Sequence, residues 1–130
     1  MPLQVIQPHN VHDTSVFAYS HAVRMGDLIF VAGQVAIDPQ GKLVGPGDIR
    51  GQTEQVFRNL TEVLLAAGSR MENVGKLTVL TTHIEHRVVI HEIRSRIFGA
   101  IGHFPASTLA IVSSLANPDW LVEIEAVALA

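Results

Sequence analysis

The amino-acid sequence predicts an α+β domain in which two helices cover one face of a mixed β-sheet. Two observations indicate this class. β-branched runs too short for long helices occur before, between and after two stretches in which apolar residues recur at helical spacing. These two amphipathic stretches are enough to cover one face of a four- to six-stranded sheet. With 130 residues there is room for one hydrophobic core, so we expect a single domain over residues 1–130.

The N-terminal part of the chain predicts two strands and a turn. Residues 3–6 are apolar enough for an edge strand, whereas the β-branched run over residues 28–37 predicts a strand buried on both faces. Residues 38–41 follow as a turn, because proline stands second and glycine fourth.

Two helices are expected in the middle of the chain. The first begins after Asp48, which can cap its N-terminus, and ends at Gly68. The second extends from about Arg87 to Gly99. Each presents one apolar stripe, which consists of Ile49, Val56, Phe57, Leu60, Val63, Leu64 and Ala67 in the first helix and of Val89, Ile93 and Ile97 in the second.

β-branched residues predict three further strands, at residues 76–84, 107–115 and 121–130. The two faces of the last strand consist of Val122, Ile124, Ala126 and Ala128 on one side and of Leu121, Glu123, Glu125, Val127 and Leu129 on the other. Because both faces carry apolar residues, something outside the chain must cover the second face. The simplest candidate is another copy of the chain.

The composition excludes several classes of function. The net charge is −3 with a pI of about 6.1, and Lys and Arg form no run, which argues against a nucleic-acid binder and a polybasic membrane anchor. Without cysteine there is no disulfide, thiol nucleophile or cysteine-ligated metal. The sequence has neither a signal-peptide pattern nor an apolar run near the ~20 residues of a membrane span. We therefore expect a soluble, cytoplasmic protein.

Two groups of charged residues are candidates for chemistry. Glu123 and Glu125 lie two apart on one strand face among apolar residues. They form either a partly desolvated carboxylate suited to proton transfer or a solvated, ion-paired strand end. His91 lies off the apolar stripe of its helix, with Arg87 and Arg94 nearby, so the three residues form either a cationic face or ordinary helix surface.

Gly33 and the paired histidines allow two readings each. A glycine inside a buried strand indicates a bulge or a ligand close to the backbone, or else tight packing.

His9 and His12 are three residues apart, as are His83 and His86. Neither pair supplies three convergent ligands, so we expect solvated loop histidines and no metal site.

Several segments of the chain resemble the Rid (RidA/YjgF) family. They are Ala18-Tyr19-Ser20-His21-Ala22, Gly26-Asp27-Leu28-Ile29-Phe30-Val31-Ala32-Gly33-Gln34, Ile49 with Gln52-Thr53, Gln55 and Asn59-Leu60, Ala66-Ala67-Gly68, Pro105-Ala106, and Glu123-Ile124-Glu125-Ala126. These segments have the order and spacing of the family and cover the chain from about Tyr19 to Ala128.

The resemblance implies a chorismate-mutase-like α+β fold, assembled as a homotrimer with sites in the clefts between subunits. Well-known members hydrolyse reactive enamines and imines to keto acids and ammonia without a cofactor. The resemblance therefore implies a small-molecule substrate and no cofactor, and we expect no nucleic-acid or membrane partner. Ribonuclease activity has also been ascribed to the family, and the acidic pI gives it no support.

Three residues match the family's pocket, and the position of its arginine does not. Tyr19 matches the pocket tyrosine, Gly33 the strand glycine, and Glu123 the glutamate thought to activate or hold water. The arginine that follows Pro-Ala and binds the substrate carboxylate is replaced by Ser107, which cannot form a charged, bidentate clamp. Thr108 keeps the hydroxyl of the next position.

Four further positions depart from the family pattern. Ala32 stands where the family has a strand serine, and Leu109 where it has a small polar residue or cysteine. On the second helix, His91 replaces an asparagine and Arg94 a tyrosine. The resemblance therefore implies a retained scaffold with a rewritten pocket.

These observations lead to two main hypotheses about function. The first is an imine or enamine deaminase with a non-standard substrate, for example an aminomuconate-like one. Its candidate residues are Glu123, Tyr19 and His91 for catalysis and Ala32, Gly33, Arg94, Ser107 and Thr108 for substrate binding. The second is a non-catalytic trimer that binds a metabolite or a protein partner and does not need Glu123. A third, weaker hypothesis is a holdase-like role, which needs an exposed apolar patch.

Overall fold

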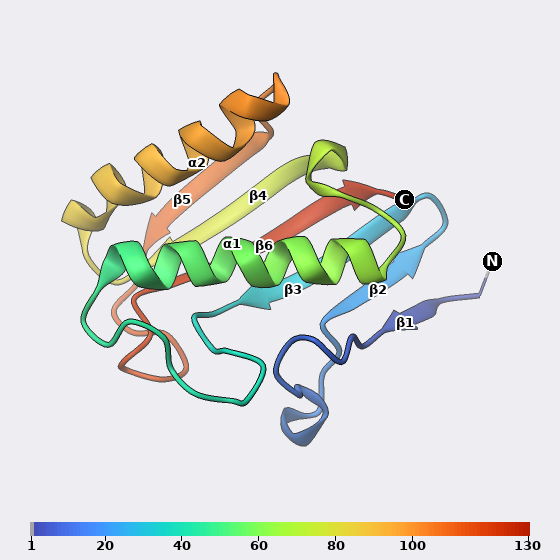
Figure 1. The fold of residues 1–130 in the computed structure, drawn as a ribbon, viewed down its shortest axis with the longest axis horizontal. Helices are drawn as coiled ribbons and strands as arrows, with labels where there is room; N and C mark the ends of the chain where they lie inside the picture. The colour runs from blue at the N-terminus through green and yellow to red at the C-terminus, as the bar shows by residue number, and fades with distance from the viewer. Residues whose placement is uncertain (1) are drawn as a thin grey trace.

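Six strands form one sheet, and two long helices pack against it (Figure 1). The computed structural model describes residues 2–130. The strands are β1 (Gln4–Ile6), β2 (Ala22–Met25), β3 (Leu28–Gln34), β4 (Val74–Thr81), β5 (Ala106–Ile111) and β6 (Val122–Leu129), and the helices are α1 (Ile49–Ala66) and α2 (Arg87–Ile101). This arrangement confirms the predicted α+β class.

The sheet is mixed and has the strand order β1-β2-β3-β6-β4-β5. β4 and β5 are parallel, and the other neighbouring strands are antiparallel. α1 connects β3 to β4 and α2 connects β4 to β5, since parallel strands require a crossover segment of this kind. β6, the last strand, therefore lies between the two strands that α1 connects.

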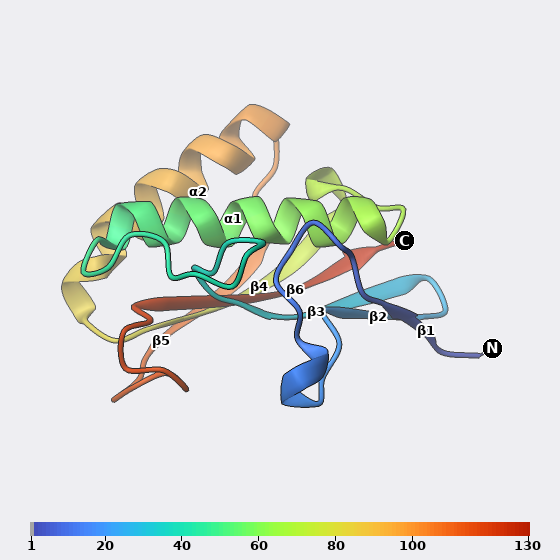
Figure 2. The same cartoon turned by 60° about the horizontal axis from the view of Figure 1, so that its bottom comes forward.

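Both helices lie on the same side of the sheet (Figure 2). The core between the layers contains Val56, Phe57, Leu60, Val63 and Leu64 of α1, Ile90, Ile93 and Phe98 of α2, and Ile29, Val31, Leu77, Val79, Val122 and Ile124 of the strands. On the opposite face, Leu28, Phe30 and Leu129 remain 40%, 41% and 58% exposed. One chain thus leaves open the second face, the one that we expect a partner to cover.

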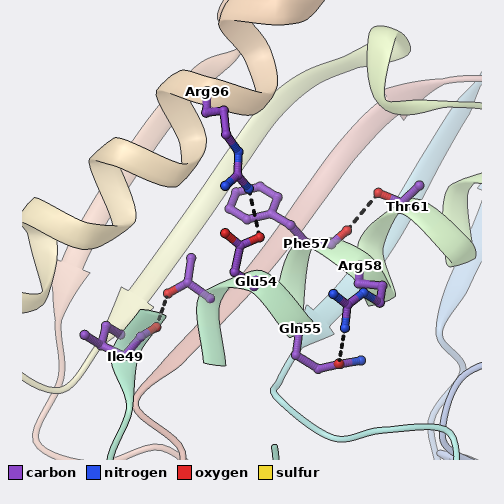
Figure 3. Close-up of polar contacts among 8 residues, drawn as sticks. Ile49, Glu54, Gln55, Phe57, Arg58, Thr61 and Arg96 are labelled. Carbon is purple, nitrogen blue, oxygen red and sulfur yellow. Dashed lines mark hydrogen bonds and ion pairs between the residues drawn. The ribbon is translucent and has the colours of Figure 1, made fainter. Parts of the chain in front are cut away.

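The predicted bounds of α1 are confirmed. Asp48 caps the helix by accepting a hydrogen bond from the backbone N–H of Arg50 at 3.1 Å. An ion pair of 2.8 Å between Arg96 and Glu54 joins α2 to α1 (Figure 3). Exposed pairs of this kind stabilise a fold by only about 0–1 kcal/mol, so the two helices are held mainly by the apolar core that they share with the sheet.

Within residues 2–130, neither helix is long and apolar enough to cross a membrane.

The apolar stripe of α2 is rotated relative to the predicted one. Val89 and Ile97 are only partly buried, whereas Ile90, Ile93 and Phe98 are at most 1% exposed. The Phe98 ring packs edge-on against the ring of Phe57 on α1, with 6.3 Å between the centroids. The prediction missed this rotation because the aromatic contact comes from a distant part of the chain.

The strands differ from the predicted ranges at their ends. β3 ends at Gln34 and β5 at Ile111, where the backbone N–H of Val112 donates to the carbonyl of Thr81. β2 was not predicted. It is a four-residue strand that reaches β3 through a two-residue turn, in which Gly26 adopts a φ of 62° that favours glycine.

A buried polar network connects the N-terminal segment to β3 through His21, the residue before β2. His21 Nε2 lies 2.6 Å from the carbonyl of His12, and its Nδ1 lies 3.1 Å from Nε2 of Gln34. A carbonyl only accepts and an amide NH₂ only donates, so neutral His21 with its proton on Nε2 satisfies both contacts. Burial and, to a lesser extent, the neighbouring His21 lower the pKa of His12 from 6.5 to about 4. His12 is therefore a buried neutral residue and not the solvated loop histidine that we expected.

We predict that the stability of the fold decreases as the pH falls from 6.5 towards 4. In this window the unfolded chain protonates His12, whose ordinary pKa is 6.5, while the folded chain does not until about pH 4. The burial of His21 lowers its pKa as well and acts in the same direction. Urea unfolding at several pH values measures the slope. His12→Phe should make it shallower, whereas the exposed control His9→Phe should not, and equal slopes in all three proteins would refute the assignment.

Candidate active site

A cleft of about 560 Å³ opens beside the bulged end of β3. Its walls are Phe17, Tyr19, Ala32, Gly33, Ala116, Asn117, Trp120 and Glu123. Two segments that contribute to these walls, the turn before β2 and the connection from β5 to β6, project from the sheet on the side away from the helices (Figure 2). Four predicted site residues, Tyr19, Ala32, Gly33 and Glu123, are therefore brought together.

A β-bulge places Gly33 against Glu123. Val31 pairs with Ala126 and Gln34 with Ile124, so two residues of β3 face one residue of β6. A Cβ atom at Gly33 would lie 2.7 Å from Cγ and Cδ of Glu123, closer than real atoms approach. The expected bulge is confirmed, and the close contact is with a side chain of the same protein, which is the tight packing that we considered as the alternative to a ligand.

The surroundings of Glu123 raise its pKa above the ordinary value. Partial burial is the main cause, and the negative charge of Glu125 on the same strand face adds to it. The pKa of Tyr19 is raised too, first by burial and then by the charge of Glu123, which places the phenol near the carboxylate. Glu123 can therefore accept a proton and also return it closer to neutral pH than a solvated glutamate can.

Backbone and side-chain hydrogen bonds fix the turn that carries Phe17 and Tyr19. The hydroxyl of Thr14 donates to the carbonyl of Tyr19 at 2.7 Å, and the N–H of Phe17 donates to the carbonyl of Thr14 at 2.9 Å. Ala18 adopts a φ of 65°, a left-handed conformation that costs a residue with a Cβ roughly 1–2 kcal/mol. The turn is held in one shape despite this cost.

Gln52 of α1 fixes the opposite wall of the cleft. Its side chain is fully buried, donates to the carbonyl of Asp119 at 3.0 Å and accepts from the N–H of Leu121 at 2.9 Å. These two residues flank Trp120, so one buried amide holds the backbone on both sides of the indole. Phe17 and Trp120 were not among the predicted site residues.

Three of the four remaining predicted residues lie around a second hollow, of about 260 Å³, between α2 and β5. His91, Arg94 and Ser107 line it together with Phe104. Arg94 donates a hydrogen bond of 2.9 Å to the hydroxyl of Ser107. The side chain of Arg94 thus reaches the position where the family pattern has its arginine, and His91 is an exposed neighbour on the same helix.

A single chain does not bring the two groups of residues together. Ala110 of β5 lies level with Glu123 across β4, and Ser107 is three residues further along. Two strand spacings and three residues correspond to roughly 14 Å between Glu123 and Ser107. Thr108 points to the opposite sheet face from Ser107, where it accepts a hydrogen bond from Lys76 at 2.7 Å.

The histidines that we considered as metal ligands form pairs. The rings of His83 and His86 lie edge to face with 5.0 Å between their centroids, and His86 Nδ1 lies 3.0 Å from the hydroxyl of Thr81. Across residues 2–130, the structure assembles no group of three or more His, Asp or Glu side chains that could hold a metal ion.

We predict that Glu125→Gln lowers the pKa of Glu123. Removing the neighbouring charge makes ionisation easier, while burial keeps the pKa above the ordinary value. NMR titration of the side-chain carboxyl carbons measures this change directly. Glu72→Gln, an exposed substitution elsewhere, serves as the control. An unchanged Glu123 titration in Glu125→Gln would show that the two carboxylates do not interact.

Comparisons with known proteins agree with this geometry. The family model described as Endoribonuclease L-PSP matches residues 12–130. A RutC family protein of Pyrococcus abyssi is 38% identical over 110 residues, which cover 85% of this chain and 84% of that protein. The 2-iminobutanoate/2-iminopropanoate deaminase of Rattus norvegicus is 36% identical over 114 residues, which cover 88% of this chain and 81% of that protein.

A crystal structure of a conserved Rid family protein of unknown function from Yersinia pestis superimposes with a TM-score of 0.93 at 33% identity, and the match covers 99% of this chain and 100% of that chain. Fold, sequence and the match of the family model over almost the whole chain thus agree, and the chain belongs to the Rid family.

Proposed function

We propose that this protein is a cofactor-independent imine deaminase, which hydrolyses an imino acid, or the enamine that is its tautomer, to a keto acid and ammonia. The observation that carries the proposal is the half-buried Glu123 carboxylate, with its raised pKa, beside Tyr19 and Gly33 in a cleft lined by no other charged side chain. The similarity to the rat 2-iminobutanoate/2-iminopropanoate deaminase supports the same class of reaction.

The proposed reaction needs one carboxylate and one water molecule. Glu123 accepts a proton from the water as the water oxygen bonds to the imine carbon, and it passes this proton to the nitrogen to give a carbinolamine. Glu123 then accepts the hydroxyl proton of the carbinolamine and transfers it to the amine nitrogen, which leaves as ammonia as the C–N bond breaks and the carbonyl group forms. The Tyr19 hydroxyl donates a hydrogen bond to the substrate, and the raised pKa keeps this phenol protonated.

In the proposed site, Arg94 supplies the positive charge that Ser107 lacks. Its guanidinium already reaches the Ser107 hydroxyl, and a guanidinium is the side chain best suited to a carboxylate. His91, in the same hollow, is a candidate second acid or base because an imidazole can both accept and donate a proton. Thr108 faces away from this hollow and lies on the sheet face of Glu123 and Glu125, so its proposed contact with the substrate would come from that face.

We further propose that the complete site forms between copies of the chain, in a homotrimer. Within one chain, Glu123 and Ser107 are too far apart for one small substrate, so a second copy has to bring an Arg94 hollow to a Glu123 cleft. The open sheet face, with Leu28, Phe30 and Leu129 exposed, gives such an assembly an apolar contact surface. A chain without cysteine also suits the reducing cytoplasm, where we place it.

Other functions have less support from the cleft. No lysine or arginine lines it, and the net charge is −3, which disfavours binding of RNA phosphates despite the ribonuclease description of the family model. The same lack of a basic residue disfavours an aminomuconate-like diacid, whose second carboxylate would be unpaired there. A non-catalytic metabolite-binding trimer is the alternative that the following experiment separates.

We predict that Glu123→Gln lowers the rate of imine hydrolysis about a hundredfold or more, because the amide cannot accept the proton of the water. Imines generated by an amino-acid oxidase and the release of ammonia from them provide the assay. Glu72→Gln should behave as the wild type. A wild type without turnover that is nevertheless stabilised against heat by keto acids would favour the non-catalytic alternative.

We also predict that Arg94→Met raises KM for imino acids about tenfold to a hundredfold, since a hydrogen bond to a charged group is worth about 1.5–3 kcal/mol. Hydrolysis of an imine without a carboxylate should change little. Arg96→Met is the matched control, because Arg96 lies on the same helix and pairs with Glu54 instead of lining the hollow. An equal rise in KM for both kinds of imine would argue against Arg94 as the carboxylate ligand.

A further inference from the structure

We infer that the cleft selects imino acids with an aromatic side chain, and that Phe17 and Trp120 determine this specificity; the inference rests on the proposed function. The chain contains five phenylalanines, one tyrosine and one tryptophan. Three of these seven aromatic residues, Phe17, Tyr19 and Trp120, line this one cleft. Two others, Phe57 and Phe98, pack in the core.

Phe17 has no role in the core. Its side chain is 67% exposed, and it belongs to a short 3₁₀ turn with no buried residue. The turn is nevertheless held by several hydrogen bonds, including those of Asp13 with the N–H and the hydroxyl of Ser15, and it retains Ala18 in its unfavourable left-handed conformation. An apolar ring on a fixed turn indicates a surface that is covered when a ligand binds.

Trp120 is fixed from the other side of the cleft. Gln52 holds the backbone before and after it, so the point from which the indole extends is fixed by a fully buried residue of α1. Walls that are ordered before binding lose little conformational entropy when a ligand arrives. Both aromatic walls are therefore suited to bind a flat apolar group.

The polar and apolar parts of the cleft determine how a substrate is oriented. The reacting carbon has to lie near Glu123 and Gly33, and the remaining walls consist of rings, of the small residues Ala32 and Ala116, and of Asn117. A phenyl side chain that extends from the reacting carbon can stack on the rings or meet them edge-on, which strengthens binding beyond simple burial of area. A two-carbon side chain is too short to cover both rings.

Tryptophan fluorescence tests this inference without turnover, since Trp120 is the only tryptophan and lies in the cleft. The probes are 3-phenyllactate and 2-hydroxybutanoate, stable acids whose second carbon is tetrahedral like that of the carbinolamine. We expect 3-phenyllactate to bind about tenfold more tightly, which corresponds to about 1.4 kcal/mol. Phe17→Ala should reduce this ratio to below about threefold while 2-hydroxybutanoate binds as before.

Val16→Ala is the matched control, because Val16 lies in the same turn, is 73% exposed and does not line the cleft. It should keep the tenfold preference. Equal affinity for the two acids, no binding of 3-phenyllactate, or an unchanged preference in Phe17→Ala would each overturn the inference. A Phe17→Ala variant whose particle mass falls in light scattering would overturn it too, because Phe17 would then contact a second copy of the chain.

Hydrolysis of the imines of phenylalanine and 2-aminobutanoate, measured on the same proteins, separates this inference from the proposed function. If 3-phenyllactate binds more tightly but neither imine is hydrolysed, the proposed deaminase activity is refuted and the aromatic specificity of the cleft is supported. If both imines are hydrolysed at equal kcat/KM and the two acids bind equally, the deaminase activity is supported and the aromatic specificity is refuted.

Discussion

The cleft depends on the close approach of the Glu123 side chain to Gly33, where β3 bulges out of its ladder with β6. Only a residue without a side chain leaves room for the carboxylate at this point. The same contact keeps Glu123 partly out of water, and this burial is the main reason for its raised pKa. Backbone geometry and acid strength are thus coupled through one glycine, and a change in the bulge alters the carboxylate as well.

Buried amide side chains connect the helices to the loops of the cleft. Gln52 holds both sides of Trp120, and Gln34 donates to the carbonyl of Ala32 within the bulge. Asn59 of α1 donates to the carbonyls of Val35 and Ile37, just beyond β3. A buried polar group without a partner costs about 1–3 kcal/mol, so each amide fixes its loop in one position. The helices therefore stabilise the sheet and also set the shape of the cleft.

The sequence predicts those parts of the structure that depend on local signals. Asp48 and Gly68 bound α1 because capping chemistry is local, and alternation along β6 places Glu123 opposite the core. The rotation of α2 depends on contacts between residues distant in sequence, such as Phe57 with Phe98. The prediction missed Phe17 and Trp120 because contacts between distant parts of the chain also bring them into the cleft. The one tryptophan, which directly follows the expected turn at residues 117–119, could have indicated a binding site.

The two separate hollows show how the pocket can change while the fold remains. Ser107 lies on β5 and Arg94 on α2, and their hydrogen bond joins a strand position to a helix position. The guanidinium of Arg94 extends from α2 to the Ser107 position, whereas an arginine at that position would extend from β5. In the proposed site, this difference alters which side of the substrate carries the carboxylate contact and how much room is left for its side chain. Ser107 and Arg94 thus stand where the family pattern has an arginine and a tyrosine, and because neither side chain belongs to the buried core, the two changes leave the packing of the strands intact.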